Sequence, residues 1–483
     1  MIEYSARAAA EVLAVLGDTP AEVATRFARS ATARGRAVLP TDEFHRWWAG
    51  RCRIDQFAVT PIPFAELDGW HFEPDSGNLA HDTGRFFTVE GLRCRGDADR
   101  EWTQPIINQP EIGILGILAK EFDGVLQFLM QAKMEPGNVN SLQLSPTVQA
   151  TRSNYMRVHQ GSRTRFLEYF LEAKRARVLV DVLQSEQGVY FWRKRNRNMV
   201  VEVTEDVPEH EDFCWLTLHQ LLQLLKIDNL VNMDARTVLA CMALSCPPDR
   251  PAASTPFAEA LLRSYDPAYG GMRTSTEIVS WFNERKAVSD WRAHRIPLTD
   301  VTQWSRSAAE IADEDLSRFR IMAVRVGAGN REVTRWSQPL LAPRRDGIAA
   351  FLTRSVGGVL HLLVQARSEP GLLDMIEMGP TVKLPAVHDG GADILGATVP
   401  FAAELAAADP AAVRFSALLS EEGGRFYHAQ TRYQIVELAE DFPLDVPPQF
   451  CWMTVHQLMN LVHHGHYLNV EARSLLACLH ALW

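Results

Sequence analysis

The chain has 483 residues, of which 47% are hydrophobic and 22% are charged, so wholesale disorder is excluded and a sizeable core is expected. At roughly 150 residues per domain, this length predicts two to four domains. Asp and Glu outnumber Lys and Arg by 59 to 49, and the resulting net charge of −10 argues against a general nucleic-acid binder. One small anionic ligand held by a few local arginines remains compatible with this charge.

The cysteines and the start of the chain indicate a reduced, cytoplasmic protein. The seven cysteines form no C-x-x-C pair and show no zinc-ribbon spacing. The first residues lack the basic-then-apolar pattern of a signal peptide. The apolar run over residues 112–118 is far shorter than the ~20 residues that cross a bilayer. We therefore expect no membrane contact and no bound metal.

In chain order, the Ala-rich residues 1–40 predict an N-terminal helical extension with no clear counterpart later in the chain. Residues 41–245 then form a first domain in which helical and strand patterns are mixed. Alternating apolar side chains over residues 124–131 predict a strand after a turn, and leucines at helical spacing over 218–225 predict a helix. Asn232, followed by Asp234, predicts the N-cap and first turn of a closing helix.

The chain repeats itself at an offset of 234 residues, which explains its length. Trp102 recurs as Trp336, and the Glu-Pro-Gly sequence at 135–137 recurs at 369–371. Farther along, the offset drifts slightly, so that Glu186 pairs with Glu421 and a Phe-Cys-Trp sequence at 213–215 recurs at 450–452. Agreement over such a span indicates a tandem duplication.

The two copies are separated by residues 246–272, whose first part is rich in Pro, Ala and Ser and has the composition of a linker. Residues 273–483 form the second copy. A period above 200 residues is too long for a solenoid, so each copy is expected to be a domain. The predicted fold class is α+β, with two tandem strand-rich domains that each close with two helices.

Three strings carry a resemblance to a known family. They are W-T-Q-P-I-I-N-Q-P-E-I-G from Trp102, M-Q-A-K-M-E-P-G-N-V-N from Met130, and L-S-P-T-V-Q-A-T-R-S-N-Y from Leu144. Together they resemble the NDP-hexose 2,3-dehydratases of deoxysugar biosynthesis for antibiotics, and the resemblance covers nearly the whole chain. The similarity extends to members that act on dTDP-4-keto-6-deoxyglucose, such as that of the epivancosamine pathway.

The resemblance implies two tandem Nudix-like domains and a homodimer. Residues 125–137 are similar to the Nudix strand that runs into a Pro-Gly turn. However, neither copy contains the Nudix helix R-E-x-x-E-E, whose carboxylates hold magnesium. The sequence therefore shows no residues that would support metal-assisted phosphohydrolysis.

The implied reaction eliminates water across carbons 2 and 3 of a dTDP-4-keto-6-deoxyhexose. The ketone acidifies the hydrogen on carbon 3, a base removes it, and the enolate expels the hydroxyl on carbon 2. The resulting enol becomes a dTDP-3,4-diketo-2,6-dideoxyhexose. The protein must supply a base, donors for the enolate oxygen and an acid for the leaving hydroxide, and no redox cofactor is needed.

Residues 133–165 of the first copy are the best candidate surface for this chemistry, because they combine uncharged polar groups with arginines. The second copy departs from them: after Lys383 it continues Leu-Pro-Ala-Val-His and has no Ser-Asn-Tyr. We therefore predict a catalytic first copy and a degenerate second copy, which still binds nucleotide or only supports the dimer. The alternative is a solvated surface in both copies that has drifted in one.

The candidate catalytic residues are Tyr155, Lys133, Glu135, Glu186 and His159. Tyr155 is the first choice for general acid or base, although a phenol with a pKa of about 10 must be perturbed to act near neutrality, and Lys133 would lower that pKa or hold the ketone oxygen. Glu135 and Glu186 are rival bases, but both recur in the second copy, which favours structural roles. His159 is a candidate acid or a structural histidine.

The candidate substrate-binding residues are mostly polar or basic, because guanidinium groups match phosphate oxygens and amides can hold a sugar. They are Gln131, Asn138, Gln143, Thr147, Gln149, Thr151, Arg152, Ser153, Asn154, Arg157, Arg163, Arg165 and Arg197, with Trp102 and Tyr190 as stacking partners for thymine. Gln131 and Trp102 also recur in the second copy, so a role within the fold is an alternative for both.

Two other functions stay open on the sequence. One is a diverged Nudix-like nucleotide-sugar pyrophosphatase, which the missing carboxylate helix disfavours. The other is a non-catalytic nucleotide-sugar binding protein.

Overall fold

The computed structural model describes residues 19–54, 57–96, 100–151, 164–172, 175–246, 253–316, 318–328, 335–384 and 399–483. Helices and strands are mixed in both repeats, as predicted. The predicted strand after Gly124 is part of β7 (Val125–Met134), and the leucines over 218–225 form α6 (Leu218–Leu224) and its C-cap. The predicted N-cap is also confirmed, since the Asn232 side chain accepts a hydrogen bond from the Ala235 amide at 2.8 Å.

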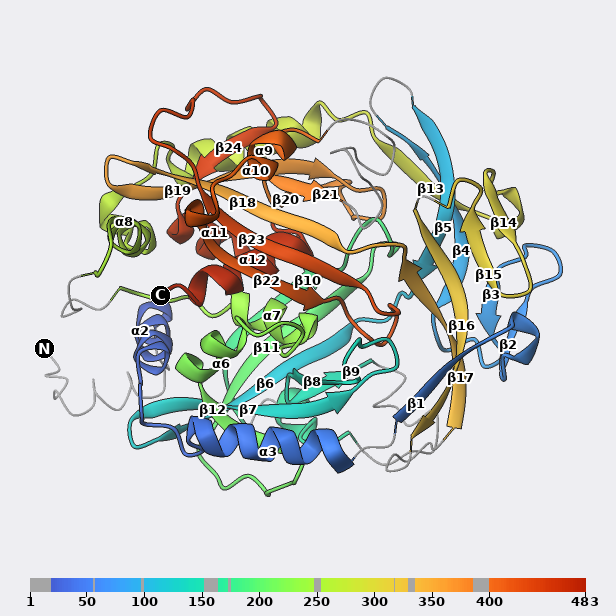
Figure 1. The fold of residues 1–483 in the computed structure, drawn as a ribbon, viewed down its shortest axis with the longest axis horizontal. Coiled ribbons are helices and arrows are strands. Elements are labelled where there is room, and N and C mark those ends of the chain that lie inside the picture. The colour runs from blue at the N-terminus through green and yellow to red at the C-terminus, as the bar shows by residue number, and fades with distance from the viewer. Residues whose placement is uncertain are drawn as a thin grey trace, which may run out of the picture.

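Each repeat builds one seven-stranded sheet with the same strand order (Figure 1). In the first repeat the order is β10 (Arg177–Ser185), β11 (Arg195–Val203), β6 (Gly113–Phe122), β7 and β12 (Phe213–Thr217), with β8 (Leu142–Ser145) beside β7 and β9 (Val148–Ala150) beside β6. In the second repeat the corresponding strands are β22 (Val413–Ser420), β23 (Gln430–Glu437), β18 (Gly347–Val356), β19 (Val359–Ser368), β24 (Phe450–Met453), β20 (Ile376–Gly379) and β21 (Val382–Leu384).

The two smaller sheets stand together at one side of the molecule, and each contains a strand from the other repeat (Figure 1). β1 (Phe57–Ile62) of the first repeat pairs with β16 (Phe319–Ala328), beside β14 (Trp304–Arg306), β15 (Glu310–Asp313) and β17 (Arg335–Pro343). In return, β13 (Arg292–Ile296) of the second repeat pairs with β4 (Thr88–Arg95), beside β2 (Trp70–Phe72), β3 (Leu79–His81) and β5 (Glu101–Asn108). The repeats therefore exchange equivalent strands.

The helices are also duplicated, and this corrects the sequence prediction for residues 1–40 and 246–272. α2 (Pro20–Ala31) begins after an N-capping Thr19, and α8 (Pro256–Tyr265) begins after an N-capping Thr255. Ser30 in α2 donates to the Leu126 carbonyl at 2.6 Å, and Ser264 in α8 donates to the Leu360 carbonyl at the same distance. The predicted extension thus has a counterpart, which lies inside the predicted linker.

The remaining helices follow the same duplication. α3 (Thr41–Ile54), α5 (Glu168–Leu171), α6 and α7 (Met233–Ala240) belong to the first repeat. α9 (Ser275–Ala287), α10 (Ala402–Ala406), α11 (Val455–Val462) and α12 (Val470–His480) belong to the second. No helix among the described residues is long and apolar enough to cross a membrane.

The two repeats share one hydrophobic core, in which residues of β7, α6 and α7 pack with residues of β19, α11 and α12. Two fully buried arginines join the closing helices across the centre. Arg236 Nε lies 3.3 Å from Ser474 Oγ, and Arg473 Nε lies 2.8 Å from Thr237 Oγ1. Each guanidinium also donates to a backbone carbonyl of the other repeat, that of Ser420 for Arg236 and that of Ser185 for Arg473. Buried charge-assisted hydrogen bonds of this kind hold the halves in one register.

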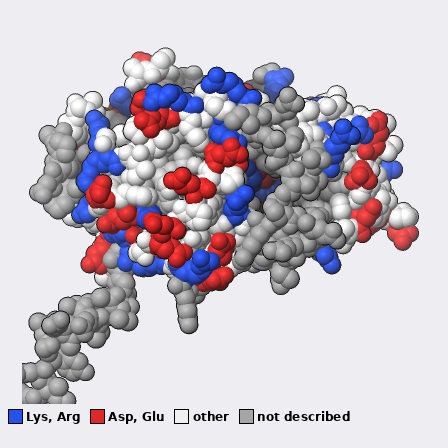
Figure 2. All heavy atoms as spheres, turned by 90° about the horizontal axis from the view of Figure 1, so that it is seen from below, with Lys and Arg blue, Asp and Glu red and all other residues white. Residues whose placement is uncertain are grey.

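Acidic and basic side chains are interspersed on the face that Figure 2 shows. The described residues on that face form no single-sign region of the size that a nucleic acid would need.

Candidate functional site

The Glu-Pro-Gly turn after each long hairpin strand is fixed against the opposite repeat. The Gly137 amide donates to the Gly423 carbonyl at 2.8 Å, and the His428 amide donates to the Gly137 carbonyl at 2.7 Å. A Cβ on Gly137 would lie 1.4 Å from the Phe426 carbonyl oxygen, so only glycine fits this backbone contact. Each turn therefore brings a glutamate from one repeat beside side chains of the other.

In the first repeat this turn presents Glu135, which is 4% exposed. Its Oε1 accepts a hydrogen bond from Gln149 Nε2 at 2.8 Å and lies 3.2 Å from Lys133 Nζ. Its Oε2 is buried and has no hydrogen-bond partner among the described residues. A buried carboxylate oxygen without a donor is costly, and such an atom is typical of a position where a substrate group binds or a proton is transferred.

Three further carboxyl groups gather around the buried guanidinium of Arg425, which comes from the second repeat. Arg425 Nε lies 2.6 Å from Glu422 Oε2, and its Nη2 lies 3.2 Å from Glu186 Oε1. Its Nη1 donates to Gln109 Oε1 at 3.0 Å. Burial opposes the charge of Arg425, but Glu422 and Glu186 raise its pKa above the ordinary value, so it stays a cation.

Asp234 completes this group, which we call the first cluster: Glu135, Glu186, Asp234, Glu422, Arg425, Lys133 and Gln149. Asp234 lies in the first turn of α7, is 1% exposed, and has an Oδ1 with no hydrogen-bond partner among the described residues. Burial raises its pKa well above the ordinary value, and the negative charges of Glu422, Glu186 and Glu135 add to the effect. The protonated form of Asp234 is therefore favoured more than in an ordinary aspartate.

In the equivalent group of the second repeat, the second cluster, an ammonium bridges two of the carboxyl groups. It consists of Glu369, Arg367, Lys383, Glu471, Glu421, Gln187 and Tyr190. Lys383 Nζ lies 2.7 Å from Glu369 Oε1 and 2.6 Å from Glu471 Oε1. Glu369 Oε2 accepts the Gly188 amide at 2.8 Å, so both oxygens are paired. Burial opposes ionisation of Glu369, but Lys383 and Arg367 lower its pKa below the ordinary value.

The structure brings only some of the predicted site residues into the first cluster. Lys133, Glu135, Glu186 and Gln149 belong to it. Thr151 follows Gln149 by two residues, at the last described position before residues 152–163. The predicted residues Arg152, Ser153, Asn154, Tyr155, Arg157, His159 and Arg163 lie outside the described residues.

Several predicted binding residues have contacts within the fold. Thr147 Oγ1 donates to the Leu129 carbonyl and accepts the Leu118 amide, and Thr381 repeats both contacts in the other copy. Gln143 Nε2 donates to Ser420 Oγ of the other repeat at 2.7 Å, and Asn138 Nδ2 donates to the Ser141 carbonyl at 3.1 Å.

The predicted arginines and aromatic residues lie at separate places. Arg197 pairs with Asp181 on the partly exposed face of β11, while its neighbour Asn196 points to Glu186. Arg165 is exposed. Trp102 packs edge-on against Trp291 with ring centroids 5.4 Å apart, in the core of a small sheet. Tyr190 packs against Phe319 and Phe426 and occupies the position in the second cluster that Arg425 has in the first. Gln131 is partly exposed near the end of β7.

Asp234, Glu422 and Arg425 were missed as site residues in the sequence. In the sequence Asp234 is recognisable only as a residue of the first turn of a helix, because its closeness to Glu135 depends on the tertiary fold. Glu422 and Arg425 were missed because they belong to the repeat predicted to be degenerate. The one available signal was the difference between Gln187 and Tyr190 in the first copy and Glu422 and Arg425 in the second.

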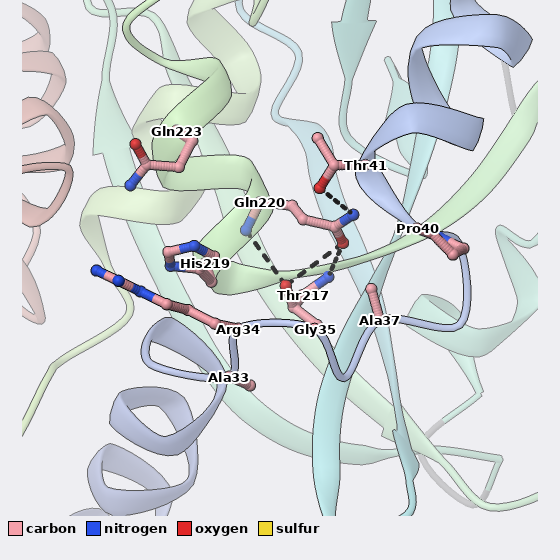
Figure 3. A pocket seen from close by; sticks show the side chains of 10 residues that line it. All are labelled: Ala33, Arg34, Gly35, Ala37, Pro40, Thr41, Thr217, His219, Gln220 and Gln223. Carbon is pink, nitrogen blue, oxygen red and sulfur yellow. Dashed lines mark hydrogen bonds between the residues drawn. The ribbon is translucent and has the colours of Figure 1, made fainter.

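A pocket of about 420 Å³ lies elsewhere, between residues 33–41 and the start of α6 (Figure 3). Its polar groups are used in helix capping: Gln220 Nε2 donates to the Leu39 carbonyl at 2.8 Å, and the Gln220 amide donates to Thr217 Oγ1 at 3.2 Å. No group of three or more His, Cys, Asp or Glu side chains in the described part of the chain is arranged to hold a metal ion.

Comparison with known proteins gives a consistent result over the whole chain. The model of the family described as NDP-hexose 2,3-dehydratase matches residues 41–242 and 275–479. The chain is 51% identical over 463 residues, 95% of each chain, to a protein of Saccharopolyspora spinosa named dTDP-4-dehydro-6-deoxy-alpha-D-glucopyranose 2,3-dehydratase. Proteins of the same name from Amycolatopsis orientalis and Streptomyces violaceoruber are 45% and 46% identical, over 95% and 92% of this chain and 94% and 98% of theirs.

Proposed function

Since the chain belongs to the NDP-hexose 2,3-dehydratase family, we propose that it removes water across carbons 2 and 3 of dTDP-4-keto-6-deoxyglucose in deoxysugar biosynthesis. The product is a dTDP-3,4-diketo-2,6-dideoxyhexose. The observation that supports a site assignment is the first cluster, where Glu135 keeps a buried oxygen without a partner among the described residues and Asp234 has a raised pKa.

In this proposal Glu135 is the base that takes the hydrogen from carbon 3. Gln149 and Lys133 both contact its Oε1, which leaves Oε2 to accept the proton. The electron pair of the C3–H bond forms the enolate of the carbon-4 ketone, and Lys133 is the nearest described cation that can stabilise the enolate oxygen. Positioned base catalysis of this kind contributes roughly 10²–10⁴ in rate.

Asp234 is the proposed acid. The enolate re-forms the carbon-4 ketone and expels the hydroxyl from carbon 2, which leaves as water after taking the Asp234 proton. The resulting enol has a C2–C3 double bond; it gains a proton on carbon 2 and loses its hydroxyl proton, which gives the ketone on carbon 3. Two carboxyl groups whose environments separate their proton affinities can supply both roles. Tyr155 and His159 remain predictions for the same steps, because they lie outside the described residues.

The first repeat is proposed as the catalytic half. Its cluster has four carboxyl groups near Arg425 and Lys133, whereas Lys383 and Arg367 offset the acidic groups of the second cluster. The second repeat still contributes, because Glu422 and Arg425 reach the first cluster from it. A merely structural second half would not need these two residues.

The rest of the proposal concerns the ancestry of the fold, the oligomeric state, the cellular location and the biosynthetic pathway. We propose a Nudix-like ancestry for each repeat, on the hairpin and Pro-Gly turn of residues 125–137. The family resemblance supports a homodimer and a role in antibiotic biosynthesis. The lack of a disulfide among the described residues supports a cytoplasmic location. Light scattering of the purified protein at two concentrations would test the dimer.

The reaction is tested by turnover in D₂O. Purified protein with dTDP-4-keto-6-deoxyglucose should release water and place one solvent deuterium on carbon 2 of the product, because tautomerisation adds a proton there. Mass spectrometry and NMR of the product measure this. Release of a nucleoside monophosphate without deuterium on carbon 2 would instead support a pyrophosphatase, and binding without product would support a non-catalytic protein.

A further inference from the structure

Gln149 and Lys383 occupy equivalent positions in the two clusters. Both lie on the short strand that follows the Pro-Thr sequence, where Gln149 pairs with Leu115 of β6 and Lys383 pairs with Ala349 of β18. Each side chain contacts the glutamate of its own Glu-Pro-Gly turn, at 2.8 Å for Gln149 and 2.7 Å for Lys383. The register is the same, so the two clusters differ here by a neutral amide against an ammonium.

We infer that this difference decides which cluster can do acid–base chemistry. Lys383 holds the carboxyl groups of the second cluster in ion pairs. Gln149 is the positioning residue that orients Glu135 and leaves the carboxyl groups of the first cluster available for proton transfer. The inference rests on the proposed function. Lys383 bridges Glu369 and Glu471, the counterparts of Glu135 and Asp234, so one ammonium occupies the space between the two carboxyl groups. In the first cluster, Gln149 Oε1 instead accepts Asn232 Nδ2 at 3.4 Å, and its amide contacts Glu135 alone.

The glutamates of the two turns differ in the same way. Glu135 Oε2 is buried without a partner among the described residues, whereas both oxygens of Glu369 are paired. The acidic residues at the start of the closing helices do not differ in this respect, since Asp234 Oδ1 and Glu471 Oε2 are both buried without a partner among the described residues. An amide donor orients Glu135 but adds no charge, whereas the Lys383 ammonium places a positive charge between two carboxyl groups, and a neighbouring positive charge disfavours the protonated form that an acid needs.

Gln149→Lys should therefore impose the second cluster's state on the first. We expect kcat to fall about 100-fold or more, with KM changed less than about threefold, because the lost step is proton transfer. Gln149→Ala removes the positioning amide without adding a cation, so kcat should fall, but at least tenfold less than in Gln149→Lys. If Gln149→Lys stays within fivefold of the wild type, or if Gln149→Ala falls as far as Gln149→Lys, the inference is overturned.

Lys383→Gln gives an independent measurement that survives poor folding of the first variant. Removing the ammonium leaves Glu369 and Glu471 without their shared partner, so the urea midpoint should fall while kcat is retained. An unchanged midpoint would show that Lys383 does not hold these carboxyl groups in ion pairs and would overturn the inference. Glu135→Gln in the same assays distinguishes a failure of the proposed function from a failure of this inference. Retained activity in that variant would contradict the catalytic role proposed for Glu135, but not the ion pairing of the second cluster by Lys383.

Discussion

At the scale of single residues, Asp234 shows how a group proposed for catalysis can lower the stability of the folded protein. It lies in the first turn of α7, where a negative charge interacts favourably with the helix dipole. Burial and the neighbouring Glu422, Glu186 and Glu135 nevertheless raise its pKa well above the ordinary value. In the pH range between its unfolded and folded pKa, the folded state binds a proton that the unfolded state does not. Stability contributed by this group is therefore present at acid pH and is lost as the pH rises.

Replacing Asp234 with Asn should remove this loss while keeping the size of the side chain. We expect the free energy of unfolding to rise at pH 8, with little change near pH 4, because holding a proton on a carboxyl group costs free energy wherever the pH is above the unfolded pKa of that group. Urea unfolding at several pH values measures this. Activity should fall at the same time, since Asn cannot donate the proton.

The matched control is Glu471→Gln in the second cluster. Glu471 pairs with Lys383 at 2.6 Å, so its neutralisation leaves the ammonium with one carboxylate fewer and should destabilise the protein. Opposite signs for the two variants are expected. A loss of stability at pH 8 in Asp234→Asn would contradict the protonated state assigned to Asp234.

At the scale of elements, the exchange of β1 and β13 binds the two halves together. β1 pairs with β16 over Phe57 to Ile62, and β13 pairs with β4 over Arg292 to Ile296. The shared core and the Arg236–Ser474 and Arg473–Thr237 contacts add a second, buried interface. The covalent connection between Cys246 and Ala253 is thus only one of several links between the repeats.

Cutting that connection should leave the molecule whole. A specific protease site placed within residues 247–252 and then cleaved should give two fragments on a denaturing gel, a single species in size-exclusion chromatography and one cooperative unfolding transition, because exchanged strands cannot separate without unpairing. A protein without the inserted site, treated with the same protease, controls for other cuts. Separation of the fragments under native conditions would show that the exchange contributes little.

At the scale of the whole molecule, the sequence predicted the duplication and the α+β class because repeated motifs and hydrophobic periodicity are local signals. It also selected Lys133, Glu135 and Gln149 within the candidate surface of residues 133–165, and Glu186 as a separate candidate base. It could not predict the strand exchange or the contact of Arg425 with the first cluster, because both depend on residues that lie about 200 or more positions apart in the chain. The counterpart of α2 was missed since its shared sequence is short: a Thr-Pro start and one buried serine.

The central claim is that a molecule with two equivalent clusters uses the first for proton transfer. The most direct measurement compares kcat of Glu135→Gln and Glu369→Gln on dTDP-4-keto-6-deoxyglucose, with circular dichroism to confirm that both variants fold. Glu135→Gln should lose at least ~100-fold in kcat, because glutamine cannot accept the carbon-3 proton, while Glu369→Gln should stay within about fivefold of the wild type. Equal losses in the two variants, or a loss confined to Glu369→Gln, would contradict the account.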